Sequence, residues 1–128
     1  MITGRVTDDG REAAITLRLF APGPTEDGRS ADIRAVIDSG FTDWLFVPTA
    51  VAEQLDLPLR GSVEAELADG RVERLPVHRA RVSWHGRTRS VKAYVAPAGE
   101  ALIGMSLLRG SRLTVDAVPG GDVRIEEL

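Results

Sequence analysis

The triplet Asp38-Ser39-Gly40 is the part of this sequence whose residue types could do chemistry. The apolar run Ala35-Val36-Ile37 comes directly before it, so the carboxylate stands at the end of a predicted buried strand. A carboxyl group held there can accept and donate protons in general acid–base catalysis. Asp-Ser-Gly is also a common turn sequence. Burying a carboxylate is costly, however, and a purely structural strand end has no need of one.

A second apolar strand that ends in glycine, Leu102-Ile103-Gly104, follows later in the chain. Between the two elements lies a predicted hairpin over about 62–77, with Ala68-Asp69-Gly70-Arg71 at its tip. Asp-Gly is typical of a two-residue hairpin turn, and Asp69 is most simply the first residue of that turn. The long arms and polar tip are those expected of a mobile flap over a site.

Apolar residues recur at every second position through most of the chain, which predicts strands. The predicted strands lie near 15–19, 33–37, 63–67, 75–84, 91–95, 101–104, 113–115 and 123–125. The apolar phase switches near His78-Arg79, which predicts a bulge or a bend. The one convincing helix has Pro48 in its first turn, and a single helical turn covers 105–109. The pattern therefore predicts an all-β domain, closed or folded over, with little helix.

Composition excludes several classes of protein. The 128 residues suit one domain over 1–128, and the net charge of −3, with scattered basic residues, argues against a nucleic-acid-binding face. The absence of cysteine excludes disulfides, thiolate nucleophiles and cysteine-based zinc sites. No apolar run is long enough to span a membrane. The N-terminus lacks the apolar core of a signal peptide, so the expected location is the cytoplasm.

The two histidines, His78 and His85, are too few for a multi-ligand metal site. Neither forms an obvious catalytic triad with Ser39, so both are expected to face solvent. Trp44 and Trp84 are expected to pack in the core or in an interface. No metal or cofactor is predicted.

The segment from Ala35 to Gly40, followed by Leu45-Phe46-Val47-Pro48, resembles the active-site strand and loop of the retropepsin-like aspartic proteases. In that family an Asp-Thr/Ser-Gly triplet is followed by a flap hairpin and then by an apolar-apolar-Gly element. Asp69-Gly70 and Leu102-Ile103-Gly104 occur here in that order. The likeness covers roughly 4–125 and is nearest to small single-domain bacterial members. It implies a retropepsin-like acid protease barrel with one short α-helix after the active-site loop and a helical turn near the C-terminus.

The resemblance also implies an aspartic endopeptidase with Asp38 as its catalytic residue. Two carboxyl groups about 3 Å apart share one proton, so one can act as a base on water while the other polarises the peptide carbonyl. This chain has one triplet and is too short for a two-lobed arrangement, so two copies on a two-fold axis would supply the dyad. A homodimer is therefore expected. Activity is expected to be favoured at mildly acidic pH, because the dyad must keep one proton.

Further site residues follow from the same resemblance. Ser39 would brace the two active-site loops against each other, and Gly40 would let the backbone come close to the substrate. An extended polypeptide would bind by strand addition. The residues expected to contact it are Phe41, Thr42, Asp43, Ala68, Asp69, Gly70, Arg71, Leu102, Ile103 and Gly104.

Two features depart from the family pattern. Phe41 is bulky where the family usually has a small residue, and the flap tip carries Asp69 and Arg71 in place of a glycine-rich or aromatic tip. Both features favour a competing hypothesis, a catalytically silent retropepsin-like module that dimerises or binds peptides. A third hypothesis is a β-barrel domain that only assembles with partners.

Overall fold

The computed structural model describes residues 1–23, 29–66 and 69–128. Strands make up 58% of the described residues and helices 8%, so the all-β prediction is confirmed. The elements are β1 (Ile2–Val6), β2 (Ala13–Phe20), β3 (Ser30–Ile37), β4 (Leu45–Pro48), α1 (Thr49–Gln54), β5 (Leu59–Glu66), β6 (Val72–Trp84), β7 (Arg87–Ala96), β8 (Ala101–Ile103), α2 (Met105–Leu108), β9 (Ser111–Val115) and β10 (Asp122–Glu127).

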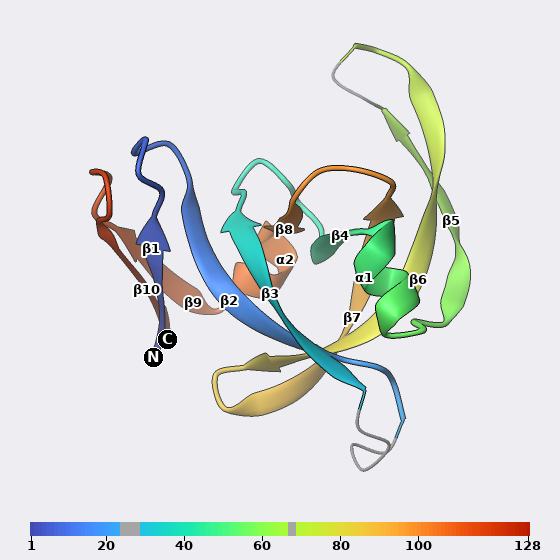
Figure 1. Cartoon of the computed structure of the whole chain (residues 1–128), viewed down its shortest axis with the longest axis horizontal. Helices are drawn as coiled ribbons and strands as arrows, with labels where there is room; N and C mark the ends of the chain where they lie inside the picture. The colour runs from blue at the N-terminus through green and yellow to red at the C-terminus, as the bar shows by residue number, and fades with distance from the viewer. Residues whose placement is uncertain (24–28, 67–68) are drawn as a thin grey trace.

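Six of the strands close into a barrel. Neighbours along the sheet are β6, β7, β4, β8, β3 and β2, and a short pairing of β2 with β6 joins the two ends. β5 continues beyond the barrel beside β6, and β1, β10 and β9 continue beyond β2 on the opposite side (Figure 1). Closure satisfies the backbone groups of the barrel strands that would otherwise form an open edge.

Apolar side chains from all six barrel strands fill the interior of the barrel. Leu19, Val47, Val82 and Ile103 are completely inaccessible to solvent, and Trp84 is 2% exposed, as its predicted core role requires. Among the described residues, no polar or charged side chain is fully buried. The barrel is therefore a packed core, and any site must lie on its rim or surface.

The two helices lie where the sequence predicts them. α1 packs Ala52 against the core, with Leu55 and Leu57 after its end. Pro48 is the last residue of β4 and the N-cap of α1, one position before the helix, because its φ of −67° also suits an extended strand end. No helix in the described ranges is long and apolar enough to cross a membrane.

β6 changes the face that it buries half-way along its length. Its buried residues have odd numbers before His78 and even numbers after Arg79, as the apolar phase predicts. The irregularity itself lies in the neighbouring strand, where the register of β5 shifts between Leu59 and Gly61. The first part of β6 thus belongs to a projecting hairpin with β5, and the rest belongs to the barrel.

The sequence pattern does not predict β1. Only Ile2 and Val6 are apolar there, and Gly4 between them usually weakens a strand. In the structure, a Cβ atom on Gly4 would lie 2.1 Å from the carbonyl oxygen of Ala14 in β2. Glycine is therefore required by the close approach of the two strands.

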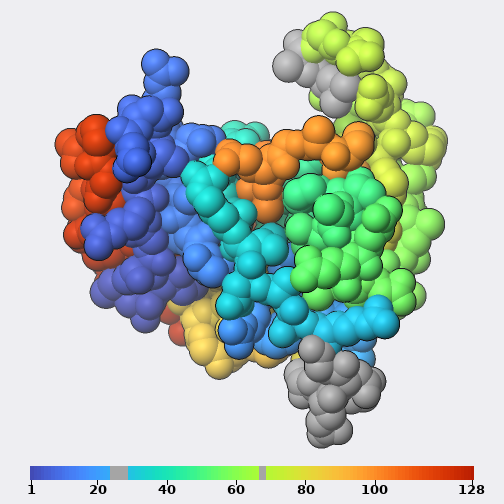
Figure 2. Space-filling view, in the orientation of Figure 1, coloured from blue at the N-terminus to red at the C-terminus, as the bar shows by residue number. Residues whose placement is uncertain are grey.

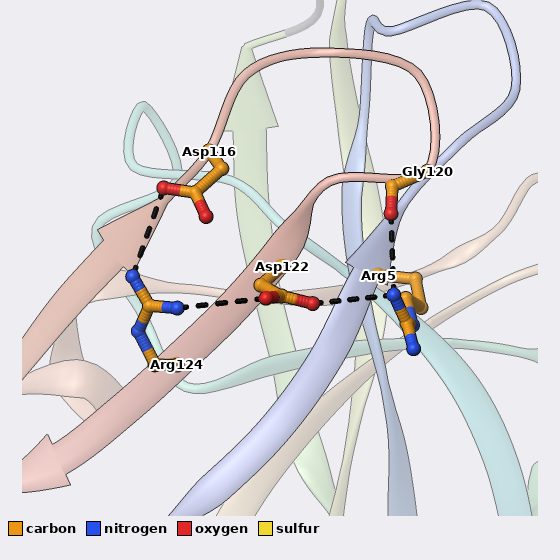
Figure 3. Close-up of polar contacts among 5 residues, drawn as sticks. All are labelled: Arg5, Asp116, Gly120, Asp122 and Arg124. Carbon is orange, nitrogen blue, oxygen red and sulfur yellow. Dashed lines mark hydrogen bonds and ion pairs between the residues drawn. The ribbon is translucent and has the colours of Figure 1, made fainter.

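Ion pairs connect the turn between β9 and β10 to β1 (Figure 3). A guanidinium nitrogen of Arg5 lies 3.2 Å from the carboxylate of Asp122 and 3.3 Å from the carbonyl oxygen of Gly120. Arg124 lies 3.6 Å from Asp116 and 3.7 Å from Asp122. Asp122 therefore bridges two arginines at the surface.

We expect Asp122→Ala to lower the free energy of unfolding by about 1 kcal/mol or less, because exposed ion pairs contribute little in water. The side chains of Arg5 and Asp122 are 76% and 55% exposed, so solvent screens their attraction. Urea denaturation of both proteins measures the difference. A loss of about 3 kcal/mol would mean that this network is a main stabilising feature of the fold, contrary to this expectation.

Candidate active site

Asp38 stands at the carboxyl end of β3, where β3 runs parallel to β8. Ile37 and Ile103 are register partners, and the next amide, that of Asp38, donates a hydrogen bond to the Ile103 carbonyl at 2.9 Å. The Gly40 amide donates to Oδ1 of Asp38 at 2.9 Å, which turns the loop around the carboxylate. The second predicted element thus holds the backbone of Asp38, and the residue's own loop holds its half-buried carboxylate.

Gly104 allows the active-site loop, residues 38–44, to lie directly against the end of β8. A Cβ atom at Gly104 would lie 2.1 Å from the carbonyl oxygen of Asp43 and 2.7 Å from the Phe41 ring. The Gly104 amide also donates to the Trp44 carbonyl at 3.0 Å. No larger residue fits at this position without moving the loop.

The first residues of α2 form hydrogen bonds to the backbone of the same loop. The Met105 amide donates to the Phe41 carbonyl at 2.8 Å, and the Ser106 amide donates to the Asp43 carbonyl at 3.1 Å. The Ser106 hydroxyl adds a 2.7 Å bond to the Thr42 carbonyl. Three consecutive carbonyls of the loop are therefore bonded, so the carboxylate of Asp38 is carried on a well-supported backbone.

An aromatic cluster lies on one side of the loop. The Phe41 ring contacts Phe46 and Tyr94 edge-on, with ring centroids 6.1 Å apart in each pair. The Tyr94 hydroxyl donates a hydrogen bond to the carboxylate of Asp43, whose other oxygen accepts from the Trp44 amide at 3.0 Å. Burial, the hydrogen bond to Asp43 and its negative charge raise the pKa of Tyr94 to about 12. Phe41 is thus half-buried among aromatic rings.

The pair nearest the tip of the β5–β6 hairpin, within the described residues, is Glu66 with Val72. Gly70 has a φ of +84°, as an Asp-Gly turn requires. The predicted contact residue Ala68 lies outside the described residues.

Asp69 and Arg71 clasp each other at this tip. Asp69 accepts hydrogen bonds from the Arg71 amide at 3.0 Å and from its Nε at 2.6 Å, and these bonds lower the pKa of Asp69. The predicted turn role of Asp69 agrees with this geometry. Both side chains are largely exposed.

The hairpin projects beside the end of the barrel at which β3 and β8 finish (Figure 1). Figure 2 shows an open hollow between the hairpin and the opposite rim, which is formed by the connection from β1 to β2. The active-site loop, which connects β3 to β4, lies at this end of the molecule.

A family model described as aspartyl protease matches residues 25–107. This range includes the active-site loop, the hairpin and the Leu102-Ile103-Gly104 element, and it is more than half of the chain. The chain belongs to the aspartyl protease family. No curated protein sequence matches it.

Solved structures show which branch of aspartyl protease folds this chain resembles. A retropepsin-like aspartic protease from Rickettsia conorii is 19% identical, with a TM-score of 0.62 over 99% of this chain and 92% of that one. EIAV protease, complexed with the inhibitor HBY-793, is 13% identical, with a TM-score of 0.61 over 77% and 86%. Simian foamy virus (mac) protease is 20% identical, with a TM-score of 0.50 over 73% and 90%. At these identities the likeness shows the fold, which confirms the predicted retropepsin-like barrel.

The structure of this aspartyl protease brings some predicted site residues together and sets others apart. Ser39 and Thr42 are exposed on the loop, and Leu102 is half-buried next to it. Ile103 is wholly buried in the core, so its carbonyl group, rather than its side chain, reaches the loop. Gly104 likewise acts through its backbone. The roles of these residues toward a substrate stay predictions.

The solvent-facing prediction for the two histidines is wrong, since both are half-buried. His85 lies 2.7 Å from the Ser111 hydroxyl, and its ring contacts Trp84 edge-on. The Nδ1 atom of His78 is buried at the hairpin base. Strand periodicity assigns a face to each residue but does not reveal that a neighbouring strand covers that face. No group of three or more potential metal-ligating side chains occurs within the described ranges.

Sequence patterns alone miss Tyr94 and Phe46. They become neighbours because β4 and β7 pair in parallel, with Phe46 opposite Tyr94. The alternation of residues along the strand could have indicated Tyr94. It lies between the buried residues Ala93 and Val95, so its side chain is on the face away from the core. A lone aromatic hydroxyl on that face of a strand is a candidate partner for a loop carboxylate.

Tyr94 is the only tyrosine of the chain, so its ionisation can be followed by near-ultraviolet absorbance. We expect a midpoint near pH 12 in place of the ordinary 10.0. Asp43→Asn should lower this midpoint, because it removes the carboxylate that accepts the hydrogen bond and repels the phenolate, while burial remains. Because the folded-state pKa is raised, stability from the neutral phenol is complete below pH 10 and is lost as pH rises through 12. A wild-type midpoint near 10 in the folded protein would contradict the Asp43–Tyr94 bond.

Proposed function

We propose that this chain is an aspartic endopeptidase whose catalytic dyad is formed by Asp38 from two copies. The observation that supports it best is the position of Asp38, whose amide is bonded to Ile103 while its half-buried carboxylate stands on the loop surface. The sequence holds one Asp-Ser-Gly triplet, so a second copy is the source of the partner carboxylate.

The two carboxyl groups, brought to about 3 Å, would share one proton because they cannot both ionise. The ionised member removes a proton from a water molecule, which attacks the peptide carbonyl, while the protonated member donates to the carbonyl oxygen. The acid and base then exchange roles and protonate the departing amine. No metal or cofactor takes part in this scheme.

The loop also carries the residues proposed to join the two copies. Ser39 is exposed beside Asp38, and its hydroxyl is the group proposed to bond the loop of a second copy. A Cβ on Gly40 would lie 3.3 Å from Oδ1 of Asp38, a close contact.

We assign the whole chain, residues 1–128, to one domain, a view supported by the 99% coverage in the comparison with the Rickettsia protein. The cytoplasmic location stays a prediction.

The proposed substrate is an extended polypeptide that lies in the hollow between the active-site loop and the hairpin. Thr42, Asp43 and the half-buried Leu102 border the loop side. The described part of the hairpin tip, residues 69–71, would cover the peptide. Extended chains suit this arrangement because backbone hydrogen bonds and alternate side-chain pockets can both be used.

A silent peptide-binding module is the second candidate function. The Asp69–Arg71 clasp favours it, because an exposed charged tip excludes water less well than an apolar one. The first test incubates purified protein with a synthetic peptide library at pH values from acidic to neutral. The mass of the protein is measured separately by sedimentation. Cleavage that is strongest at mildly acidic pH supports the protease. A dimer that binds peptides and cleaves none supports the silent module, and a monomer at micromolar concentration contradicts both.

A further inference from the structure

A pocket lined by basic side chains lies at the base of the β5–β6 hairpin. Its volume is about 220 Å³, and it is bounded by β5, β6 and β7. Its charged lining residues are Arg60, Arg79 and Lys92, and none of the described residues that line it is Asp or Glu. In a chain whose net charge is −3, the pocket is a local concentration of positive charge.

The strand pairing explains how these cations come together. Arg79 in β6 and Lys92 in β7 are register partners, so their side chains leave the sheet on the same face. Arg60 lies at the point where the register of β5 shifts, next to Gly61 with a φ of +149°. A β-bulge redirects a side chain, and here it adds a third cation to the pair.

These cations have no carboxylate partner among the described residues. Arginines nearer the hairpin tip are neutralised by Asp or Glu side chains. By contrast, no ion pair in the described part of the chain involves Arg60, Arg79 or Lys92. Within the described residues, the guanidinium of Arg79 donates only to the neutral hydroxyl of Ser90, at 3.0 Å. Three neighbouring positive charges repel one another, and a bound anion relieves that repulsion.

Tyr94 connects this pocket with the active-site loop. Its side chain lines the pocket, donates to the Asp43 carboxylate and contacts the Phe41 ring. The pocket therefore adjoins the Asp43 end of the active-site loop through one shared residue, Tyr94.

We propose that this pocket binds an acidic side chain of the polypeptide substrate and so determines which peptides are cleaved. The inference rests on the proposed function, since it names the substrate class of the same site. Guanidinium groups bind carboxylates through paired charge-assisted hydrogen bonds, which suits Asp or Glu better than a neutral amide.

The first test compares octapeptides that carry Glu, Gln or Lys at one position at a time. At the position whose side chain enters the pocket, we expect the Glu peptide to be cleaved by the wild-type protein with a kcat/KM roughly tenfold above that of the Gln peptide. Lys92→Glu should remove this preference and favour Lys. Arg87→Gln, at the far end of β7 where Arg87 pairs with Glu127, removes the same kind of charge and should leave the preference unchanged. Equal rates for Glu and Gln at every position overturn the proposal.

A binding test separates this inference from the proposed function. Immobilised Asp38→Asn protein is incubated with a random synthetic dodecapeptide mixture, and the retained peptides are sequenced. Retention of Asp- and Glu-rich peptides, lost in the double variant with Lys92→Glu, supports the pocket even if the wild-type protein cleaves nothing. Retained peptides with no acidic bias, or no retention at all, overturn the pocket even if the wild-type protein is an active protease.

Discussion

Asp38→Asn is expected to lower peptide cleavage by at least about a thousandfold while leaving the fold intact, because it removes the group proposed to transfer the proton. An asparagine cannot ionise, and in a dimer the substitution changes both members of the dyad at once. The asparagine side chain has nearly the same shape, and its carbonyl oxygen can still accept the hydrogen bond from the Gly40 backbone amide. The measurement is kcat/KM on a cleaved peptide, with circular dichroism as the check on folding.

Asp32→Asn is the matched control for this variant. Asp32 lies on the same strand, β3, and its carboxylate pairs with Arg18 at 2.7 Å on an exposed surface. The control loses one carboxylate at a distance from the loop, so its activity should stay within about twofold of wild type. Cleavage that survives Asp38→Asn would show that another group activates the water.

Gly104→Ala is expected to cost about 3 kcal/mol of unfolding free energy, at the upper end of overpacking penalties. The added methyl group would lie 2.1 Å from a backbone oxygen, which cannot move aside as a flexible side chain can. The backbone at Gly104 has φ −97° and ψ 175°, which any residue adopts, so the cost comes from the close contact alone. Chemical denaturation measures it, and cleavage should fall as well because the loop is displaced.

Gly40→Ala is the comparison for this prediction. Its added methyl group meets the Oδ1 atom of Asp38 at 3.3 Å, a contact that a small side-chain rotation relieves. Its effect on unfolding should therefore be clearly smaller than that of Gly104→Ala. Equal stability of Gly104→Ala and wild type would mean that the loop does not lie against β8 as described.

The local part of the site could be predicted from the sequence. Asp38, Ser39 and Gly40 adjoin in the chain, and the strand before them has a clear apolar pattern. The second element was predictable for the same reason, since Leu102 and Ile103 precede a glycine. Their contact follows once the two strands are assigned to one sheet.

The sequence did not predict features that depend on the register between distant strands. Tyr94 meets Asp43 only because β7 pairs in parallel with β4, and 51 positions separate the two residues. Arg60 reaches the basic pocket because β5 carries a bulge, whereas the apolar phase of β6 indicated an irregularity without saying which strand holds it. Local patterns give the face of a side chain, and the pairing of strands decides its neighbours.

The measurement that tests the shared dyad most directly is the activity of mixed subunits. Wild-type and Asp38→Asn chains are unfolded together, refolded at a constant total concentration, and assayed on one cleaved peptide. If each active site needs Asp38 from both copies, an equal mixture should retain about one quarter of the wild-type activity, because only one dimer in four has two intact chains. A value of about one half would mean that each chain works alone, and it would contradict a dyad formed across two subunits.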